Sequence, residues 1–347
     1  MRLSDFDYEL PAELIAQQAA AVRDAARLMR LDRGTGARSH HRVSDLDTLL
    51  EPGDVLVVND TRVVPARLLG RREPSGGAVE CLLLARIDDE RWDALVHPGQ
   101  KLGVGSRAVF EGAGRRLELE VLARHYHGRR TIRLSGGDGD VDAAIDALGH
   151  VPLPPYIRRA DRPLDRERYQ TVYAAARGSV AAPTAGLHFT PALLDRLRAH
   201  GVARHAITLH VGYGTFEPVR TEQVEAHRVA AERYAVPAST AAAVNRALDE
   251  GRRIIAVGTT TTRTLEAVAR AHGGRLEPGV GQTDLYIHGD FDFRVVGGLL
   301  TNFHLPRSSL LLLVCSLAGR EAILAAYHEA IERRYRFYSY GDAMLIL

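Results

Sequence analysis

The stretch from Ala66 to Ser135 differs in its pattern of secondary-structure signals from the sequence on either side of it. Short β-prone runs recur there between glycine-rich or acidic turns, at 78–84, 92–96 and 117–122. Outside this stretch, helix and strand patterns alternate, with helix signals at 190–201 and 239–251, each with a hydroxyl residue in front and a glycine behind. Recurring short β-prone runs are typical of a small β-barrel or sandwich, and alternating helix and strand patterns are typical of a parallel α/β sheet.

The order of these two patterns along the chain predicts a discontinuous α/β domain with an inserted small β-barrel domain. We expect residues 1–65 and 150–347 to form the α/β catalytic domain and residues 66–149 to form the barrel. A chain of 347 residues with 46% hydrophobic content can bury cores for two such domains. The cleft between the domains is the expected substrate site.

Several common classes of protein are not indicated. Cys81 and Cys315 are far apart and lack metal-ligand spacing, which argues against a disulfide framework or a zinc site. The first residues lack the apolar segment of a secretory signal peptide. The most apolar run, 310–317, is shorter than the roughly 20 residues of a membrane-spanning helix. No Walker A sequence, dinucleotide fingerprint, metalloprotease motif or nucleophile elbow is present. We expect a cytoplasmic protein without a metal site.

The distribution of charge is more informative than its total. A net charge of +2 does not by itself indicate a nucleic-acid partner. Lys101 is the only lysine, and arginines gather beside aromatic residues in a run that contains Tyr156, Arg158, Arg159, Arg162, Arg166, Arg168 and Tyr169. Such a run suits phosphate contacts with base stacking, but Asp161, Asp165 and Glu167 are also compatible with a solvated, salt-bridged surface.

Polar side chains follow expected strands at the point where each strand ends. The strand over 207–211 alternates apolar and polar residues, and its polar face carries Thr208 and His210 just before Gly212 and Gly214. Ligand sites of α/β proteins usually lie at such strand ends. A buried core histidine bonded to a carbonyl is the alternative interpretation of His210.

Two further strand ends show the same arrangement. The strand over 254–257 is followed by Gly258, four threonines and a helix expected over 263–272. Hydroxyls and free N–H groups at a helix start can receive a phosphate or carboxylate, although threonines also cap helices that bind nothing. After the strand near 299–302, Asn302 and His304 share a face, and Pro306 with Ser308 opens a long helix.

Longer motifs occur in order along almost the whole chain, at 59–67, 151–157, 168–173, 180–189, 208–216, 258–260, 300–306 and 335–342. Together they closely resemble the S-adenosylmethionine:tRNA ribosyltransferase-isomerase family of queuosine biosynthesis. The resemblance implies an α/β domain with an inserted β-barrel. It also implies that the ribosyl part of S-adenosylmethionine is transferred to an aminomethyl-deazaguanine base in a tRNA anticodon and isomerised. The products are epoxyqueuosine, adenine and methionine.

The implied reaction indicates which kinds of group are needed. The sulfonium acidifies the adjacent ribose methylene, so a base must remove a proton there, while an acid assists the departure of adenine. We expect His188 and His210 to handle protons and Asp342 to orient a group or face the sulfonium, with Glu217 as a second carboxylate candidate. No metal and no cofactor beyond S-adenosylmethionine as co-substrate is required.

The strand-end argument also places the S-adenosylmethionine-binding shell, at Thr184, Gly186, Gly212, Gly214, Gly258 and Thr259. Arg158, Tyr169 and Lys101 are candidates for contact with tRNA. Asp60 and Arg62 are compatible with a structural ion pair in the turn that contains them. We expect a monomer whose partners are tRNA and S-adenosylmethionine, with no membrane.

The sequence departs from the family pattern at several positions. Where the family usually has His-x-Met-His-x-Glu, the chain has His227-Arg-Val229-Ala230-Ala-Glu232, which lacks the methionine and the second histidine. Two alternatives therefore stay open. One is another S-adenosylmethionine-dependent RNA-modifying enzyme, such as a methyltransferase, and the other is a non-catalytic tRNA-binding protein.

Overall fold

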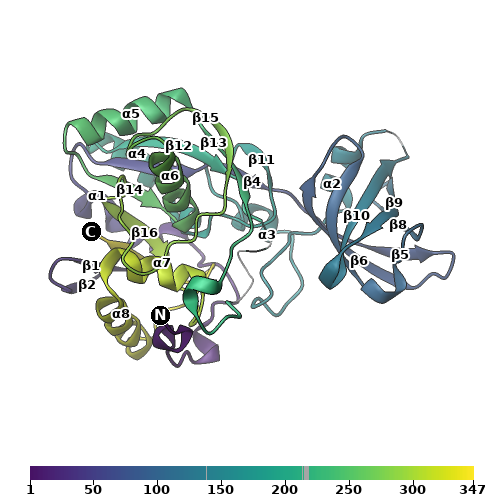
Figure 1. The fold of residues 1–347 in the computed structure, drawn as a ribbon, viewed down its shortest axis with the longest axis horizontal. Helices are drawn as coiled ribbons and strands as arrows, with labels where there is room; N and C mark the ends of the chain where they lie inside the picture. The colour runs from purple at the N-terminus through teal and green to yellow at the C-terminus, as the bar shows by residue number, and fades with distance from the viewer. Residues whose placement is uncertain (138, 213, 215–218) are drawn as a thin grey trace.

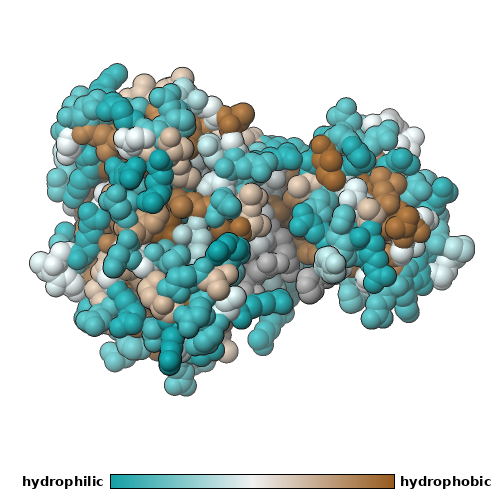
Figure 2. Space-filling view, in the orientation of Figure 1, coloured by the Kyte–Doolittle hydropathy of each residue, from teal (hydrophilic) through white to brown (hydrophobic). Residues whose placement is uncertain are grey.

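The computed structural model describes residues 1–137, 139–212, 214 and 219–347 (Figure 1). It consists of a large α/β body, which holds both chain termini, and a smaller β-barrel beside it (Figure 1). In the space-filling view the barrel is a separate lobe at the right of the larger body (Figure 2). The predicted α/β fold with an inserted β-barrel is therefore confirmed. The boundaries at 66 and 149 stay a prediction.

The α/β body contains a sheet of nine strands, counted over the described residues, in the order β15-β13-β12-β3-β14-β16-β17-β1-β2. Its strands are β1 (Arg27–Leu31), β2 (Arg38–Arg42), β3 (Val55–Asn59), β12 (Ala203–Leu209), β13 (Glu232–Val236), β14 (Ile254–Val257), β15 (Gly279–Thr283), β16 (Gly298–Asn302) and β17 (Ala343–Ile346). A short parallel pair, β4 (Thr61–Val63) with β11 (Ala176–Ser179), lies beside it.

The sheet is mixed, whereas the alternation of helix and strand patterns predicted a parallel α/β sheet. The central strands β12, β3, β14 and β16 are parallel, whereas β17 runs antiparallel to β16, and β13 and β15 add an antiparallel edge. Strand β13 follows β12 with no α-helix between them among the described residues, and antiparallel pairing permits such a connection. The parallel centre brings the carboxyl ends of β3, β12, β14 and β16 to one edge of the sheet.

Both faces of the central strands are buried because successive side chains point to opposite sides. In β14, Ile254 and Ala256 belong to the core cluster packed with α5 (Ala238–Asp249), α6 (Thr259–Ala271) and the C-terminal helices. Ile255 and Val257 belong to the cluster on the other face, packed with α1 (Leu46–Leu49) and α4 (Pro191–Ala199). A continuous apolar strand is the pattern expected for a strand covered on both faces.

The predicted helix boundaries are partly right. Helix α4 begins after Thr190, whose hydroxyl accepts a hydrogen bond from the Leu193 N–H at 3.1 Å, as its capping pattern predicts. In α5, the predicted cap is wrong, since Ser239 and Thr240 lie inside the helix and Pro237 precedes it. Pro237 has no side-chain acceptor, so the helix starts without a side-chain cap.

Two other helix predictions are corrected by the structure. Helix α6 begins at Thr259 rather than Arg263, because Thr261, Thr262 and Thr264 bond back to carbonyls four residues earlier, as helical hydroxyls do. The predicted long helix after Pro306 is α7 (Ser309–Ala318), followed by α8 (Arg320–Glu332). Gly319, at φ 84°, separates the two helices.

The barrel is closed by six strands of the described chain in the order β10-β7-β6-β5-β8-β9. They are β5 (Arg67–Glu73), β6 (Ala78–Arg86), β7 (Arg91–His97), β8 (Arg107–Gly112), β9 (Arg115–Arg124) and β10 (Arg129–Gly136). Alternate residues such as Cys81, Leu119 and Ile132 fill its interior. Helix α2 (Val141–Leu148) packs Ala144 and Ile145 against this core (Figure 1). The remaining short helix, α3 (Asp165–Arg168), belongs to the segment that returns to the α/β body.

Within the described residues, no single helix is long and apolar enough to cross a membrane. The pair α7 and α8 meets the length and composition criteria only when joined across a 115° bend.

Candidate active site

A buried amide ties three strand ends together. Asn59, at the end of β3, is fully buried; its oxygen accepts the N–H groups of Thr61 at 3.1 Å and Leu209 at 3.0 Å. Its nitrogen donates to the Leu209 carbonyl at 2.9 Å and lies 3.4 Å from the Thr260 hydroxyl. This residue therefore holds β4, β12 and the start of α6 in register at the carboxyl edge of the sheet.

His210 follows β12, as predicted, and is half-buried. Its Nδ1 lies 2.9 Å from the Thr61 hydroxyl, and Gly178 in strand β11 packs against the ring. Burial, together with the nearby Arg233, lowers the pKa of His210, while Asp60 opposes the shift. Asp60 itself accepts a hydrogen bond from Thr208 at 2.6 Å, and no ion pair joins it to Arg62 among the described residues. The interpretation of Asp60 and Arg62 as an ion pair is wrong.

Gly178 provides a way to test the position of His210. A Cβ at this residue would lie 2.8 Å from Cε1 of His210, and its φ of 151° disfavours L side chains. We expect Gly178→Ala to displace the ring and lower the free energy of unfolding by about 1–3 kcal/mol. Urea denaturation measures this change. Gly251→Ala, at φ 65° in open space, is the matched control and isolates the backbone cost. Equal losses in the two variants would show that the ring is not displaced.

His188 lies at the end of a 3-10 turn, Thr184–His188, and is buried. Its Nε2 accepts a hydrogen bond from Nδ2 of Asn302 at 3.1 Å, while Thr184 donates to Oδ1 of Asn302 at 3.0 Å. Burial lowers the pKa of His188 to about 4, against the opposing charge of Asp342. The imidazole is therefore neutral at pH 7, and its Nε2 lone pair is occupied by the Asn302 amide.

His304 is a neighbouring histidine at the same strand end as Asn302, and it is not among the predicted catalytic residues. Its Nε2 lies 2.9 Å from the Thr301 hydroxyl, its backbone N–H donates to Tyr327 at 3.0 Å, and the hydroxyl of Tyr8 donates to its carbonyl. Burial lowers its pKa to about 3. The Asn302–His304 pattern was the available signal, and the ring lines a cavity described below.

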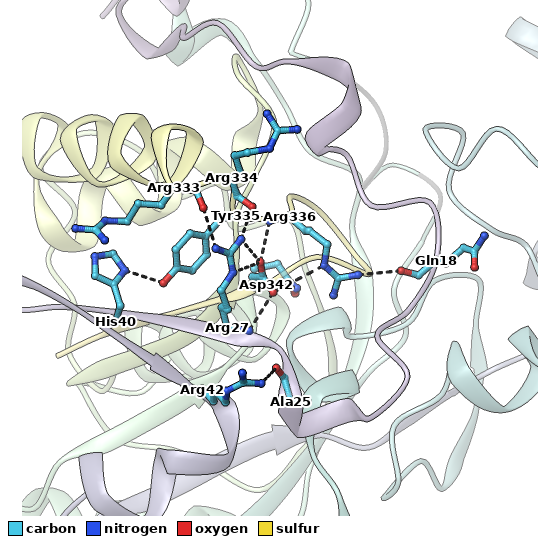
Figure 3. Close-up of polar contacts among 11 residues, drawn as sticks. Gln18, Ala25, Arg27, His40, Arg42, Arg333, Arg334, Tyr335, Arg336 and Asp342 are labelled. Carbon is cyan, nitrogen blue, oxygen red and sulfur yellow. Dashed lines mark hydrogen bonds and ion pairs between the residues drawn. The ribbon is translucent and has the colours of Figure 1, made fainter.

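Asp342 is held by an extensive set of bonds (Figure 3). Its carboxylate accepts the backbone N–H groups of Arg27 at 3.0 Å and Arg336 at 2.8 Å, and the Arg27 guanidinium at 3.2 Å. The whole residue is 2% exposed. These contacts join β1 to the C-terminal segment, and they fit the orienting alternative for Asp342, since a sulfonium-facing carboxylate would have to line a cavity. Glu217, the other carboxylate candidate, lies outside the described residues.

A cleft of about 980 Å³ opens between the barrel and the carboxyl edge of the sheet. The barrel contributes residues of β6, β7, η6 (Tyr126–Gly128) and β10, and the α/β body contributes Gly212, Gly214 and Thr259 among others. Val229 and Ala230, which stand where the family usually has methionine and histidine, also line this cleft. A cleft is therefore present where the sequence predicts the substrate site, and its substrate role stays a prediction.

A smaller pocket of about 50 Å³ adjoins the cleft and shares Thr259, Thr260 and Leu310 with it. Thr184, Gly258, Asn302 and His304 line this pocket. Five of the six predicted shell residues therefore line the two spaces. Gly186 does not, because its Cα packs tightly against the ring of Tyr173, and neither His188 nor His210 lines them directly.

A buried ion pair in the cleft wall was missed by the sequence reasoning. Glu232 accepts the Gly212 N–H at 2.8 Å with one oxygen and pairs with Arg263 through the other. Arg263 also donates to the Leu285 carbonyl at 2.8 Å. Both side chains line the cleft. The two residues are 31 positions apart, so no local spacing signalled the pair.

Some residues of the arginine run that are candidates for tRNA contact are instead buried or held in ion pairs within the protein. Tyr169 is 1% exposed and packs edge-on against Tyr340, so its proposed contact with tRNA is wrong, since a buried ring cannot stack on a base. Arg159 forms an ion pair with the buried Asp165 at 2.6 Å. Arg158 and Lys101 are exposed and stay candidates.

No group of three or more histidine, cysteine, aspartate or glutamate side chains suited to a metal occurs among the described residues. Cys81 and Cys315 are both free and buried, and burial raises the pKa of each thiol.

Comparison with known proteins shows full-length similarity to one family. A family model described as queuosine biosynthesis protein matches residues 3–346. Curated relatives named S-adenosylmethionine:tRNA ribosyltransferase-isomerase are 53% identical over 349 residues in Syntrophotalea carbinolica and 50% identical over 348 residues in Heliobacterium modesticaldum. Each of these alignments covers 100% of both chains.

A solved structure gives the same result. The crystal structure of an S-adenosylmethionine tRNA ribosyltransferase from Thermotoga maritima is 39% identical, with a TM-score of 0.57, and the alignment covers 99% of this chain and 100% of that one. The resemblance carried by the motifs is therefore confirmed along the whole length. This chain belongs to the S-adenosylmethionine:tRNA ribosyltransferase-isomerase family of queuosine biosynthesis.

Proposed function

We propose that the chain transfers the ribosyl moiety of S-adenosylmethionine to 7-aminomethyl-7-deazaguanine in tRNA and isomerises it to epoxyqueuosine, releasing adenine and methionine. The observation that carries the proposal is the pair of adjoining spaces at the carboxyl edge of the sheet. Residues selected from sequence for the S-adenosylmethionine shell, among them Thr184, Gly258 and Thr259, line them. The larger space opens toward the barrel, which leaves room for a second substrate.

The start of α6 is the proposed anchor for the methionine carboxylate. Gly258 precedes the helix with φ 87°, and Thr259 and Thr260 form its first turn in the wall of both spaces. The first N–H groups of a helix lack helical partners, and the helix dipole favours an anion there. Gly212 and Gly214 border the same cleft and admit close approach of a ligand to the backbone.

His188 and His210 are the proposed proton-handling residues. His188 acts at the smaller pocket through Asn302, whose amide donates to Nε2 of the ring and must release it before that nitrogen can take a proton, and Asp342, in the C-terminal segment, accepts from Arg27 and Arg336. His210 sits beside Thr61 at the neighbouring strand end. His304 is a further candidate because its neutral ring lines the pocket.

The reaction is tested by incubating the protein with S-adenosylmethionine and tRNA that carries the aminomethyl-deazaguanine base. We expect adenine, methionine and epoxyqueuosine in equal amounts by mass spectrometry. S-Adenosylhomocysteine in place of adenine and methionine would indicate a methyltransferase. Intact S-adenosylmethionine with folded, tRNA-bound protein would indicate a binding protein.

The role of His188 is tested by His188→Gln, which keeps a polar partner for Asn302 but removes the basic nitrogen. We expect kcat to fall by about 100-fold or more, as for loss of a general base, with little change in KM for S-adenosylmethionine. His272→Gln, at an exposed position after α6, is the matched control. Full turnover in a folded His188→Gln enzyme would exclude a proton-handling role.

A further inference from the structure

The barrel carries a hollow that the proposed active site does not use. It has a volume of about 750 Å³ and lies between two 3-10 turns, η5 (Gly99–Lys101) and η6 (Tyr126–Gly128). The described residues that line it are Val96, His97, Gly99, Gln100, Arg124, His125, Tyr126, Gly128 and Arg130. None of these is a carboxylate, whereas two are arginines and two are histidines. The hollow is therefore a basic region on a chain of nearly balanced charge.

Arg130 gives the hollow a fixed positive charge. This side chain is 1% exposed and donates to the carbonyls of Leu102 and Arg129, each at 2.9 Å, and of Gly99. Carbonyl oxygens satisfy its N–H groups without neutralising its charge, and a guanidinium stays protonated even where burial lowers its pKa. A buried charge with no acidic partner among the described residues leaves a positive potential in the hollow above it.

Arg124 adds a second charge at the rim. It is exposed at the end of β9 and stands close enough to Arg130 for its charge to lower the pKa of that guanidinium. Two like charges held together are unfavourable unless an anion lies nearby. By contrast, the next arginine along the chain, Arg129, is ion-paired with Asp93. The unneutralised charge is thus concentrated at the hollow itself.

Tyr126 lies on the border between the hollow and the active-site cleft, since it lines both. It is 89% exposed, the most exposed of the large apolar or aromatic side chains that are exposed in the described chain. A solvent-exposed aromatic ring does not stabilise the fold, because aromatic residues stabilise a protein through burial of their surface. A ring placed beside a basic hollow is the arrangement by which proteins stack a base while holding its phosphate.

We infer that this end of the barrel is an RNA-binding site, in which Tyr126 stacks on an unpaired base and the hollow over Arg124 and Arg130 holds a backbone phosphate. The identity of the RNA as the tRNA substrate rests on the proposed function. Because Tyr126 also lines the cleft, a strand bound in this way leads directly from the hollow to the S-adenosylmethionine site. In this inference Tyr126, rather than the buried Tyr169, is the residue that stacks on a base.

The inference is tested with Tyr126→Ala and Arg124→Gln, using fluorescence anisotropy of a labelled anticodon stem-loop RNA. Loss of one stacked base weakens binding by about 5- to 150-fold. For Arg124→Gln we expect weaker binding and a slope of log K against log salt that is smaller by about 0.7, as for loss of one single-strand phosphate contact. Tyr126→Phe keeps the ring and should bind nearly as wild type. Arg198→Gln, on α4 with its side chain 82% exposed, is the matched charge control.

The outcomes separate this inference from the proposed function. If Tyr126→Ala and Arg124→Gln bind the RNA as tightly and with the same salt slope as wild type, the site is wrong, even if the enzyme makes epoxyqueuosine. If both variants lose affinity but wild type releases no adenine or methionine, the RNA site stands and the proposed reaction fails.

Discussion

Glu232→Gln should lower the free energy of unfolding by about 3–5 kcal/mol, because it leaves the Arg263 guanidinium in the cleft wall without its counter-charge. The glutamine can still accept the Gly212 N–H through an oxygen, so the loss reports chiefly on the charge. The two side chains are 7% and 11% exposed, which leaves little solvent to screen Arg263. Urea or guanidinium denaturation followed by circular dichroism measures the change.

The matched control is Glu250→Gln, which breaks a surface pair with Arg252 whose carboxylate is 50% exposed. We expect a change of at most about 1 kcal/mol there. The double variant Glu232→Leu with Arg263→Met should regain much of the lost stability, because it removes the unpaired charge as well. A loss below about 1 kcal/mol in Glu232→Gln would show that the carbonyl partners of Arg263 are sufficient without Glu232.

The protein should lose stability steeply as the pH falls below 6.5, through His188 and His304. Their pKa values in the folded protein are lowered by burial to about 4 and about 3, against 6.5 for an unperturbed histidine. Between these values the unfolded chain binds more protons, so the free energy of unfolding falls as the pH falls. The full stability is present above pH 6.5, and each histidine contributes a loss of about 3 kcal/mol or more by pH 4 or below.

The measurement is the slope of unfolding free energy against pH between 6 and 4.5. His188→Gln and His304→Gln should each reduce that slope by up to about 1.4 kcal/mol per pH unit, the value for one proton. Because the slope is compared, a constant loss from the substitution itself does not matter. His272→Gln, at an exposed position, is the matched control for the substitution itself. Glu329, with a pKa lowered to about 2, loses its contribution only below pH 4.5. Unchanged slopes in both variants would contradict the buried, neutral state of the rings.

Local pattern was sufficient for much of the fold. The apolar run 254–257 is a strand with its predicted bounds, and Thr190 caps a helix as its sequence indicates, because these features depend on residues a few positions apart. The same holds for the alternating runs of the barrel. Where local signals conflicted, the prediction failed: the threonines after Gly258 suit a turn and also a helix start, and packing against the sheet selects the helix.

The candidate site divides in the same way. Polar residues at strand ends could be recognised from alternation alone, and most of the predicted shell lines one pair of spaces. The partner of each residue could not be predicted, since Asn302 and His188 are 114 positions apart and Glu232 and Arg263 are 31 apart. Burial was equally hidden: Tyr169 and Tyr126 are both tyrosines near basic residues, yet one is in the core and the other in solvent.

By itself, the sequence determined several of the strands and helices, that a barrel interrupts an α/β domain, and which family the motifs belong to. Those properties depend on side-chain periodicity and on ordered local motifs, which are present in the linear chain. Only the tertiary structure decided which polar groups meet, which rings are neutral and where the chain is basic. Those properties depend on distances and burial across long separations, and desolvation and charge pairing act only once the chain has folded.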